Sequence, residues 1–315
     1  MFLDDYLAQN GFSAEPAPLE SKVRFADDAH FRIEIPSVEG PAVLEAVIDA
    51  AQAEGITVNR VSQGSGAMLL SRAELREMAE LGAQAGLEVS LFIGPREEFD
   101  IGNHSRAADG GSLAGHARSI RQLSYAVEDV VRATEEGIRS FLVADIGLLD
   151  VLRQLQLAGD LPESLIWKTS VVIAPSNPAT FKVLERLGAS TVNVPSDVTL
   201  GQIFEFRSIS GLPIDLYVES PDPMAGVVRG HESGALIRVG SPLYVKFGLR
   251  NSTPLYPAGL HKVTEAIAIA KEKVHRAAVA LEWLERLSPD LIQSKSAAPG
   301  LGIPESAGHW RSERG

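Results

Sequence analysis

Short apolar runs recur along this chain, and in seven places a glycine stands directly before the run, where a helix pattern ends. Examples of the runs are residues 56–61, 87–92, 138–143 and 212–218. Glycine is favoured just past a helix C-terminus, because it adopts the left-handed conformation without a Cβ clash. The pattern therefore predicts seven helix–glycine–strand units, with a further strand at residues 31–35 before the first of them. The seven glycines are Gly55, Gly86, Gly137, Gly159, Gly188, Gly211 and Gly234.

Eight strands alternating with helices are typical of an α/β protein that is a single (β/α)8 TIM-like barrel. In that fold, catalytic residues stand at the C-terminal ends of the strands. We expect an N-terminal extension over residues 1–30, the barrel over 31–288 and an irregular C-terminal tail over 289–315.

The helix patterns and the segments between them give further expectations. Ser71 followed by Glu74 predicts a capping box at the start of one helix. The polar segment 94–114 is too long for an ordinary connection and is interpreted as a lid or substrate loop, with a mobile surface loop as the alternative. The tail from residue 294 is expected to lack a fold of its own, with Trp310 as its anchor. Helices are predicted near residues 3–9, 41–54, 71–85, 115–136, 147–158, 178–187, 198–210, 224–232 and 259–287.

Composition and charge narrow the classes of protein. The 315 residues carry a formal net charge of −12, which disfavours binding to nucleic acid. There is no cysteine, which excludes disulfides, thiolate nucleophiles and cysteine-ligated iron–sulfur clusters. No apolar run reaches the roughly 20 residues of a membrane span, and the first ten residues lack a secretory signal. We expect a cytoplasmic protein with no membrane partner, and the long last helix and tail favour a homo-oligomer.

Polar residues interrupt the predicted strands, where a barrel interior is usually filled with branched apolar side chains. A buried unpaired charge is very costly, so these groups must pair with one another, bind a substrate or bind a metal. The structural alternative is a set of buried ion pairs, such as Lys246 with Glu219. These polar residues are Glu34, Asn59, Asp145, Lys168, Asn193, Glu219 and Lys246.

A metal site is one hypothesis for the carboxylates. Glu34, Asp145 and Glu219 stand on separate strands and offer oxygen ligands suited to Mg²⁺ or Mn²⁺. Because no histidine stands at a strand end, a metal-free site is the preferred interpretation, and no cofactor is assigned.

The lysines suggest covalent or acid–base chemistry. A buried lysine with a lowered pKa can act as a general base or form a Schiff base. We assign Lys246 this role, with Glu219 as its acid–base partner and Lys168 as a deeper catalytic candidate. Arg250 is the expected clamp for an anion, by its planar fork of donors.

Four further residues are expected to bind the substrate. Asn177 has a competing role as the cap of the helix that follows it. The four are Asn193, Asn177, Asn59 and His104.

Residues 216–222 and 244–251 resemble the collagenase-like peptidase family U-32, and residues 193–197 support the match. The resemblance extends over about residues 31–287 and is closest to a cysteine-free branch. It implies a TIM-like barrel and a peptidase activity. Many members of the family resemble enzymes with a cysteine-bound cluster, a role that this cysteine-free chain does not inherit.

These observations favour an enzyme with lyase-type or isomerase-type chemistry on a small, anionic, oxygen-rich substrate, such as a sugar acid or a keto acid. A metal-assisted hydrolase of peptides or amides is the alternative from the family resemblance. A barrel that binds a small molecule without catalysis is the third hypothesis.

Overall fold

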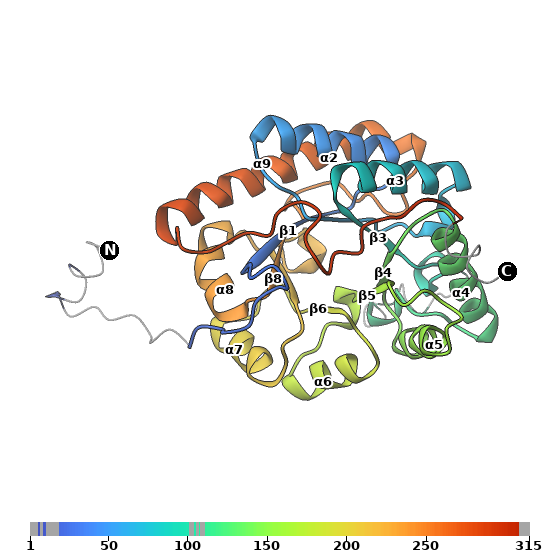
Figure 1. Cartoon of the computed structure of the whole chain (residues 1–315), viewed down its shortest axis with the longest axis horizontal. Helices are drawn as coiled ribbons and strands as arrows, with labels where there is room; N and C mark the ends of the chain where they lie inside the picture. Colours follow the sequence, from blue (N-terminus) through green and yellow to red (C-terminus); the bar gives the residue numbers. More distant parts are fainter. Residues whose placement is uncertain are drawn as a thin grey trace.

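The computed structural model is a closed barrel of eight parallel strands in sequence order, β1 to β8 (Figure 1). It describes residues 6, 9–10, 19–100, 104, 107 and 111–308. Strand β1 pairs with both β2 and β8, which closes the sheet on itself. The predicted (β/α)8 class is therefore confirmed.

Strands and helices alternate around the barrel, and β8 is followed by the long helix α9. The strands are β1 (Phe31–Pro36), β2 (Arg60–Ser62), β3 (Glu88–Phe92), β4 (Ser140–Val143), β5 (Ile166–Thr169), β6 (Thr191–Asn193), β7 (Ile214–Glu219) and β8 (Leu243–Phe247). The helices are α2 (Pro41–Glu54), α3 (Arg72–Ala85), α4 (Ile120–Glu135), α5 (Ile146–Leu157), α6 (Pro178–Arg186), α7 (Leu200–Ile209), α8 (Ser233–Gly240) and α9 (Val263–Leu287).

The expected helix ends are largely present. Gly55 and Gly86 follow α2 and α3 in the left-handed conformation, and Ser71 forms the predicted capping box with Glu74. The interpretation of Gly234 as a helix end was wrong, because this residue lies in the first turn of α8. The helix expected over residues 224–232 is replaced by two 3₁₀ turns that lead into α8. The short helix expected near residues 3–9 lies mostly outside the described residues.

Apolar side chains from alternate strand positions pack outward against the helices. Ile33, Ile35, Val89, Leu91 and Leu216 are fully buried in this shell. The positions between them face the barrel interior and carry polar or charged groups. The interior of this barrel is thus polar, while the layer between strands and helices forms the hydrophobic core. Among the described residues, no helix is long and apolar enough to cross a membrane.

The chain after α9 runs across the N-terminal end of the barrel, and Figure 1 shows it passing from α9 toward α4. The Ser294 backbone N–H donates to the Phe31 carbonyl, and Asn59 Nδ2 donates to the Ser294 carbonyl (3.0 Å). Farther along, the Gly302 N–H donates to Glu88 Oε2 inside the barrel (3.1 Å). Residues 294–308 form no helix or strand of their own, as expected, yet they seal this end of the barrel. Trp310 lies outside the described residues.

Substitution of Gly302 tests this seal. A Cβ at Gly302 would lie 2.9 Å from Ile166 Cγ1 and 3.1 Å from the Arg139 carbonyl oxygen. We expect Gly302→Ala to lower the free energy of unfolding by about 1–3 kcal/mol, the usual cost of overpacking. The control is Gly40→Ala, whose Cβ would meet nothing within 4 Å. Urea unfolding followed by circular dichroism measures both, and equal midpoints for the two variants would contradict the packing of this segment.

Candidate functional site

Arg60 on β2 lies at the centre of the barrel and is fully buried. Its Nε and one terminal nitrogen donate to Glu34 Oε2 (2.8 and 2.6 Å). The same terminal nitrogen donates to Asp215, and the other lies 3.6 Å from Glu88 Oε1. The guanidinium carbon stands 3.5 Å from the centre of the Tyr244 ring. One guanidinium therefore lies within ion-pair distance of three buried carboxylates.

Strand register brings these residues into one layer. Glu34 on β1 is the direct partner of Arg60 on β2 and of Lys246 on β8. Because paired residues of neighbouring parallel strands face the same side of the sheet, all three side chains enter the interior. The Arg60 cluster, as we call it, consists of Arg60, Glu34, Glu88, Asp215, Lys168 and Lys246.

Two lysines share the second oxygen of Glu34. Lys168 on β5 donates to Oε1, and the Lys246 amine lies 3.4 Å from the same atom. Burial opposes ionisation of Glu34, but attraction to Arg60 and to the two lysines outweighs it and holds the pKa well below its usual range. Burial lowers the pKa of Lys168 to about 7, and repulsion by Arg60 adds to the effect against the attraction of Glu34. Near neutral pH, Lys168 is thus poised to gain or lose a proton.

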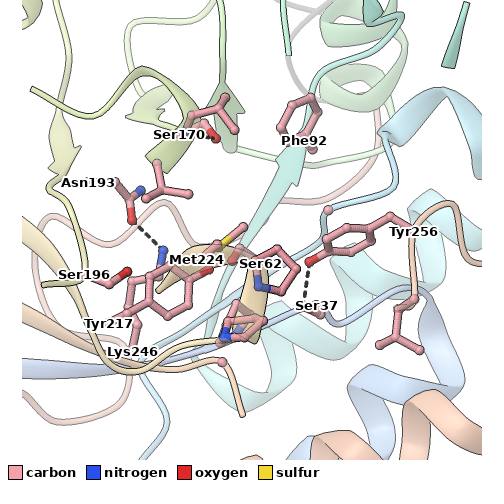
Figure 2. Close-up of a pocket in the computed structure, with 18 of the residues that line it drawn as sticks. Ser37, Ser62, Phe92, Ser170, Asn193, Ser196, Tyr217, Met224, Lys246 and Tyr256 are labelled. Carbon is pink, nitrogen blue, oxygen red and sulfur yellow. Dashed lines mark hydrogen bonds between the residues drawn. The ribbon is translucent and has the colours of Figure 1, made fainter. Parts of the chain in front are cut away.

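A cavity of about 690 Å³ opens above this layer at the C-terminal ends of the strands (Figure 2). Its lining surface is mostly apolar. Polar groups line its floor, which is the usual arrangement of a small-molecule site. Among the lining residues are Ser62, Phe92, Leu142, Val172, Asn193, Tyr217, Met224, Lys246, Leu255 and Tyr256.

Lys246 connects the charged layer to the cavity. Its amine donates to Asn193 Oδ1 (2.6 Å) and lies 4.2 Å from the centre of the Tyr217 ring, as Figure 2 shows from the pocket side. The amide of Asn193 is oriented by its own Nδ2, which donates to the Thr169 carbonyl. Lys246 is 2% exposed in a site that a ligand can enter.

Only some of the polar residues predicted in the barrel interior line the cavity. Lys246 and Asn193 line the cavity, whereas Lys168 and Glu34 lie in the layer beneath it. The structural alternative named an ion pair of Lys246 with Glu219, but the carboxylate partner of Lys246 is Glu34.

Neither Glu219 nor Arg250 is among the described residues that line the cavity. Both lie beside it. Glu219 Oε1 accepts a hydrogen bond from the Arg250 backbone N–H (3.1 Å). The Arg250 side chain is 57% exposed, and its guanidinium pairs with Asp222 (3.4 Å). The structure therefore leaves both residues away from the Lys246 amine.

Three other expected substrate residues stand apart from the cavity. The Asn59 side chain accepts from the Ile33 N–H (2.9 Å) at the N-terminal end of the barrel. Asn177 caps α6 by accepting from the Thr180 N–H (3.0 Å), the alternative that its sequence context left open. His104 is exposed, within a segment of which residues 101–103, 105–106 and 108–110 lie outside the described part.

The three carboxylates of the metal hypothesis do not meet. Glu34 is held by Arg60 and the lysines, Glu219 by the Arg250 backbone, and Asp145 caps α5 by accepting from the Leu148 N–H (2.8 Å). Within the described part of the chain, no group of three or more His, Asp or Glu residues is arranged to hold a metal ion.

Sequence reasoning missed several interior residues. Arg60 and Asp215 occupy alternate positions of β2 and β7, and the period of two that marks Glu34 and Lys246 would also have identified them. Arg96, which follows β3, lines the cavity from the expected substrate loop and is 6% exposed. No spacing in the sequence distinguishes Arg96 from a surface arginine.

Comparisons with known proteins found remote similarities to solved structures. No family model matches the chain, and no curated protein matches it. Among solved structures, CutC from Streptococcus agalactiae is 14% identical with a TM-score of 0.46, covering 69% of this chain and 98% of its own. A truncated 3-deoxy-D-arabino-heptulosonate 7-phosphate synthase from Thermotoga maritima is 15% identical with a TM-score of 0.44, covering 87% of this chain and 95% of its own.

The U32 peptidase Mk0906 is 16% identical with a TM-score of 0.39, covering 66% of this chain and 73% of its own. The expected U-32 resemblance is thus met only as a distant similarity between barrels. Similarities of this size carry no argument about chemistry, so the function has to be inferred from the site itself.

Removal of the central cation tests the Arg60 cluster. We expect Arg60→Leu to lower the free energy of unfolding by about 3–5 kcal/mol, because it leaves buried carboxylates without a partner. Urea unfolding at pH 7 measures the loss, with Arg276→Leu as a control in which an exposed arginine on α9 is removed. A loss below about 1 kcal/mol would show that the carboxylates are not held by Arg60.

The lowered pKa of Lys168 predicts a pH dependence of stability. Between about pH 7 and the ordinary lysine pKa near 10.4, the folded state binds fewer protons than the unfolded state, so unfolding becomes harder as pH rises. Lys168→Met removes this contribution. The free energy of unfolding of the wild type minus that of the variant should increase from pH 7 to pH 9, by up to roughly 1 kcal/mol per pH unit.

Urea unfolding at pH 7, 8 and 9 measures this difference. Lys182→Met, which removes an exposed lysine, is the control and should give a difference that does not change with pH. A pH-independent difference for Lys168→Met as well would refute the lowered pKa.

Proposed function

We propose that this protein is a TIM-barrel enzyme of lyase or isomerase type that acts on a small anionic carbonyl compound through Lys246. The observation that carries the proposal is the position of the Lys246 amine. It is held by Asn193 and Glu34 at the floor of a mostly apolar cavity, at the C-terminal ends of the strands. In this fold, that end of the barrel is where catalysis takes place.

The proposed chemistry is addition of the Lys246 amine to the carbonyl carbon of the substrate. The nitrogen forms a bond to carbon, and the carbonyl oxygen leaves as water with both hydrogens of the neutral amine. The product is an imine, which on protonation withdraws electrons from the neighbouring bond. Cleavage of a carbon–carbon bond or transfer of a proton beside the imine follows from that withdrawal.

The layer beneath the cavity supplies a route for the proton that Lys246 must lose first. Lys168 and Lys246 both approach Oε1 of Glu34, so a proton released by one amine can pass to the other across this carboxylate. Because the Lys168 pKa is about 7, part of this amine is unprotonated near neutral pH and is free to exchange protons across Glu34.

Tyr217 is the proposed hydrogen-bond donor to the substrate. It lines the cavity beside Lys246, and burial raises its pKa, with further contributions from Glu34 and Asp215. Its hydroxyl therefore keeps its proton and can donate to a carbonyl or hydroxyl oxygen. This role replaces the one that sequence reasoning assigned to Glu219.

Reductive trapping tests the proposal. The protein is incubated with glyoxylate, pyruvate, 4-oxobutanoate or glyceraldehyde and then with sodium borohydride, which converts an imine to a stable secondary amine. We expect mass spectrometry to find one adduct, located on the peptide that contains Lys246, and no adduct in Lys246→Met. The control variant Lys182→Met should be trapped like the wild type.

Two results would overturn the assignment. Equal labelling of the wild type and of Lys246→Met would place the reactive amine elsewhere. Binding of the same compounds, detected by calorimetry without any trapped adduct, would favour the non-catalytic binding barrel over an imine-forming enzyme.

A further inference from the structure

Arg96 is a buried cation that faces the cavity. It follows β3, is 6% exposed and lines the pocket wall. Its guanidinium carbon lies 4.4 Å from the centre of the Phe92 ring, 4.0 Å from that of Phe99 and 5.9 Å from that of Tyr256. Three aromatic rings therefore surround the charged group and fix its position.

Arg96 has a hydrogen-bond donor that is not satisfied within the described part of the chain. This donor is its buried Nε. Its ion-pair partner is Glu98, at 3.4 Å, and that carboxylate is about half exposed. A buried donor without an acceptor is costly, so a ligand that supplies an oxygen here gains the free energy that the folded protein forgoes.

The aromatic rings near Arg96 lie on a different side of the cavity from Lys246. Figure 2 shows Phe92 and Tyr256, the rings that contact Arg96, on the side away from Lys246 and Asn193. The lining also includes the apolar side chains of Leu142, Val172, Met224 and Leu255. A ligand that reaches both cations thus lies in mostly apolar surroundings.

Other charged groups that line the cavity do not substitute for Arg96. The Lys273 amine donates to the Pro36 carbonyl (2.8 Å), and burial lowers its pKa to about 8, against the attraction of Glu39. Glu98 lines the cavity beside Arg96 and adds a negative charge there. One guanidinium next to a carboxylate suits a singly charged ligand better than a doubly charged phosphate.

We infer that Arg96 binds the carboxylate of an oxo acid whose carbonyl carbon, at the other end of a short apolar chain, reaches Lys246. This inference rests on the proposed function and narrows its substrate class. The larger apolar share of the lining favours an oxo acid with few hydroxyls over a heavily hydroxylated sugar acid. The loop expected to bind substrate contributes through Arg96, near its start.

Trapping with matched pairs of compounds tests the inference. Each pair has an aldehyde acid, from 4-oxobutanoate to 7-oxoheptanoate, and an uncharged aldehyde of the same chain length. The concentration that half-saturates borohydride labelling of Lys246 is measured for wild type, Arg96→Leu and the remote control Arg276→Leu. We expect Arg96→Leu to raise this concentration at least tenfold for the best aldehyde acid and less than twofold for its uncharged partner, while Arg276→Leu matches the wild type.

Further arms separate the two proposals. Unchanged labelling by the aldehyde acids in Arg96→Leu would overturn the role of Arg96 and leave that of Lys246 intact. A larger loss for glyceraldehyde 3-phosphate than for any aldehyde acid would overturn the assignment of a carboxylate. If no aldehyde labels Lys246, the imine mechanism fails. The role of Arg96 is then tested separately, by calorimetric measurement of the binding of unreactive dicarboxylates. Weaker dicarboxylate binding to Arg96→Leu than to wild type would support the inference, and equal binding would overturn it.

Discussion

Charge balance inside the barrel is the constraint on which the rest of this structure depends. The Arg60 cluster places one arginine, two lysines and three carboxylates in a space from which water is nearly excluded. Buried charges are tolerated only when each is paired and hydrogen-bonded, so the strands must close in a register that brings them together. The pairing of Glu34 with both Arg60 and Lys246 across neighbouring strands meets this requirement.

The charged layer is covered at one end of the barrel and faces a cavity at the other. At the N-terminal end, residues 294–302 cover it and supply a backbone donor to Glu88. At the C-terminal end, the mostly apolar cavity lies above it, and Lys246 is the charged group of the cluster that lines that cavity. One amine of the cluster is thereby presented to a ligand, and in the proposed mechanism its proton is exchanged with Glu34 and Lys168 in the layer beneath.

The errors in the predicted site have local physical causes. On β7, the register shifts between Tyr217 and Glu219, so that Tyr217 pairs with Lys246 while Glu219 pairs with Phe247. Strict alternation would have placed both β7 side chains in the interior, but the shift takes Glu219 away from it. Asp145 follows β4, and Asn177 follows a 3₁₀ turn after β5. Both stand where a helix begins, and their side chains accept hydrogen bonds from N–H groups of the first turn.

Local patterns in the sequence by themselves determined the eight strand–helix units, the barrel class and the interior position of Glu34, Lys168, Asn193 and Lys246. These follow from helix-ending glycines and from the alternation of strand side chains, both of which act over a few residues. Only the tertiary structure decided which charges meet, that the tail seals the barrel and that Arg96 faces the cavity. Each of these depends on contacts between segments far apart in the chain, such as Glu34 with Lys168 or Glu88 with Gly302, and no local pattern encodes such a contact.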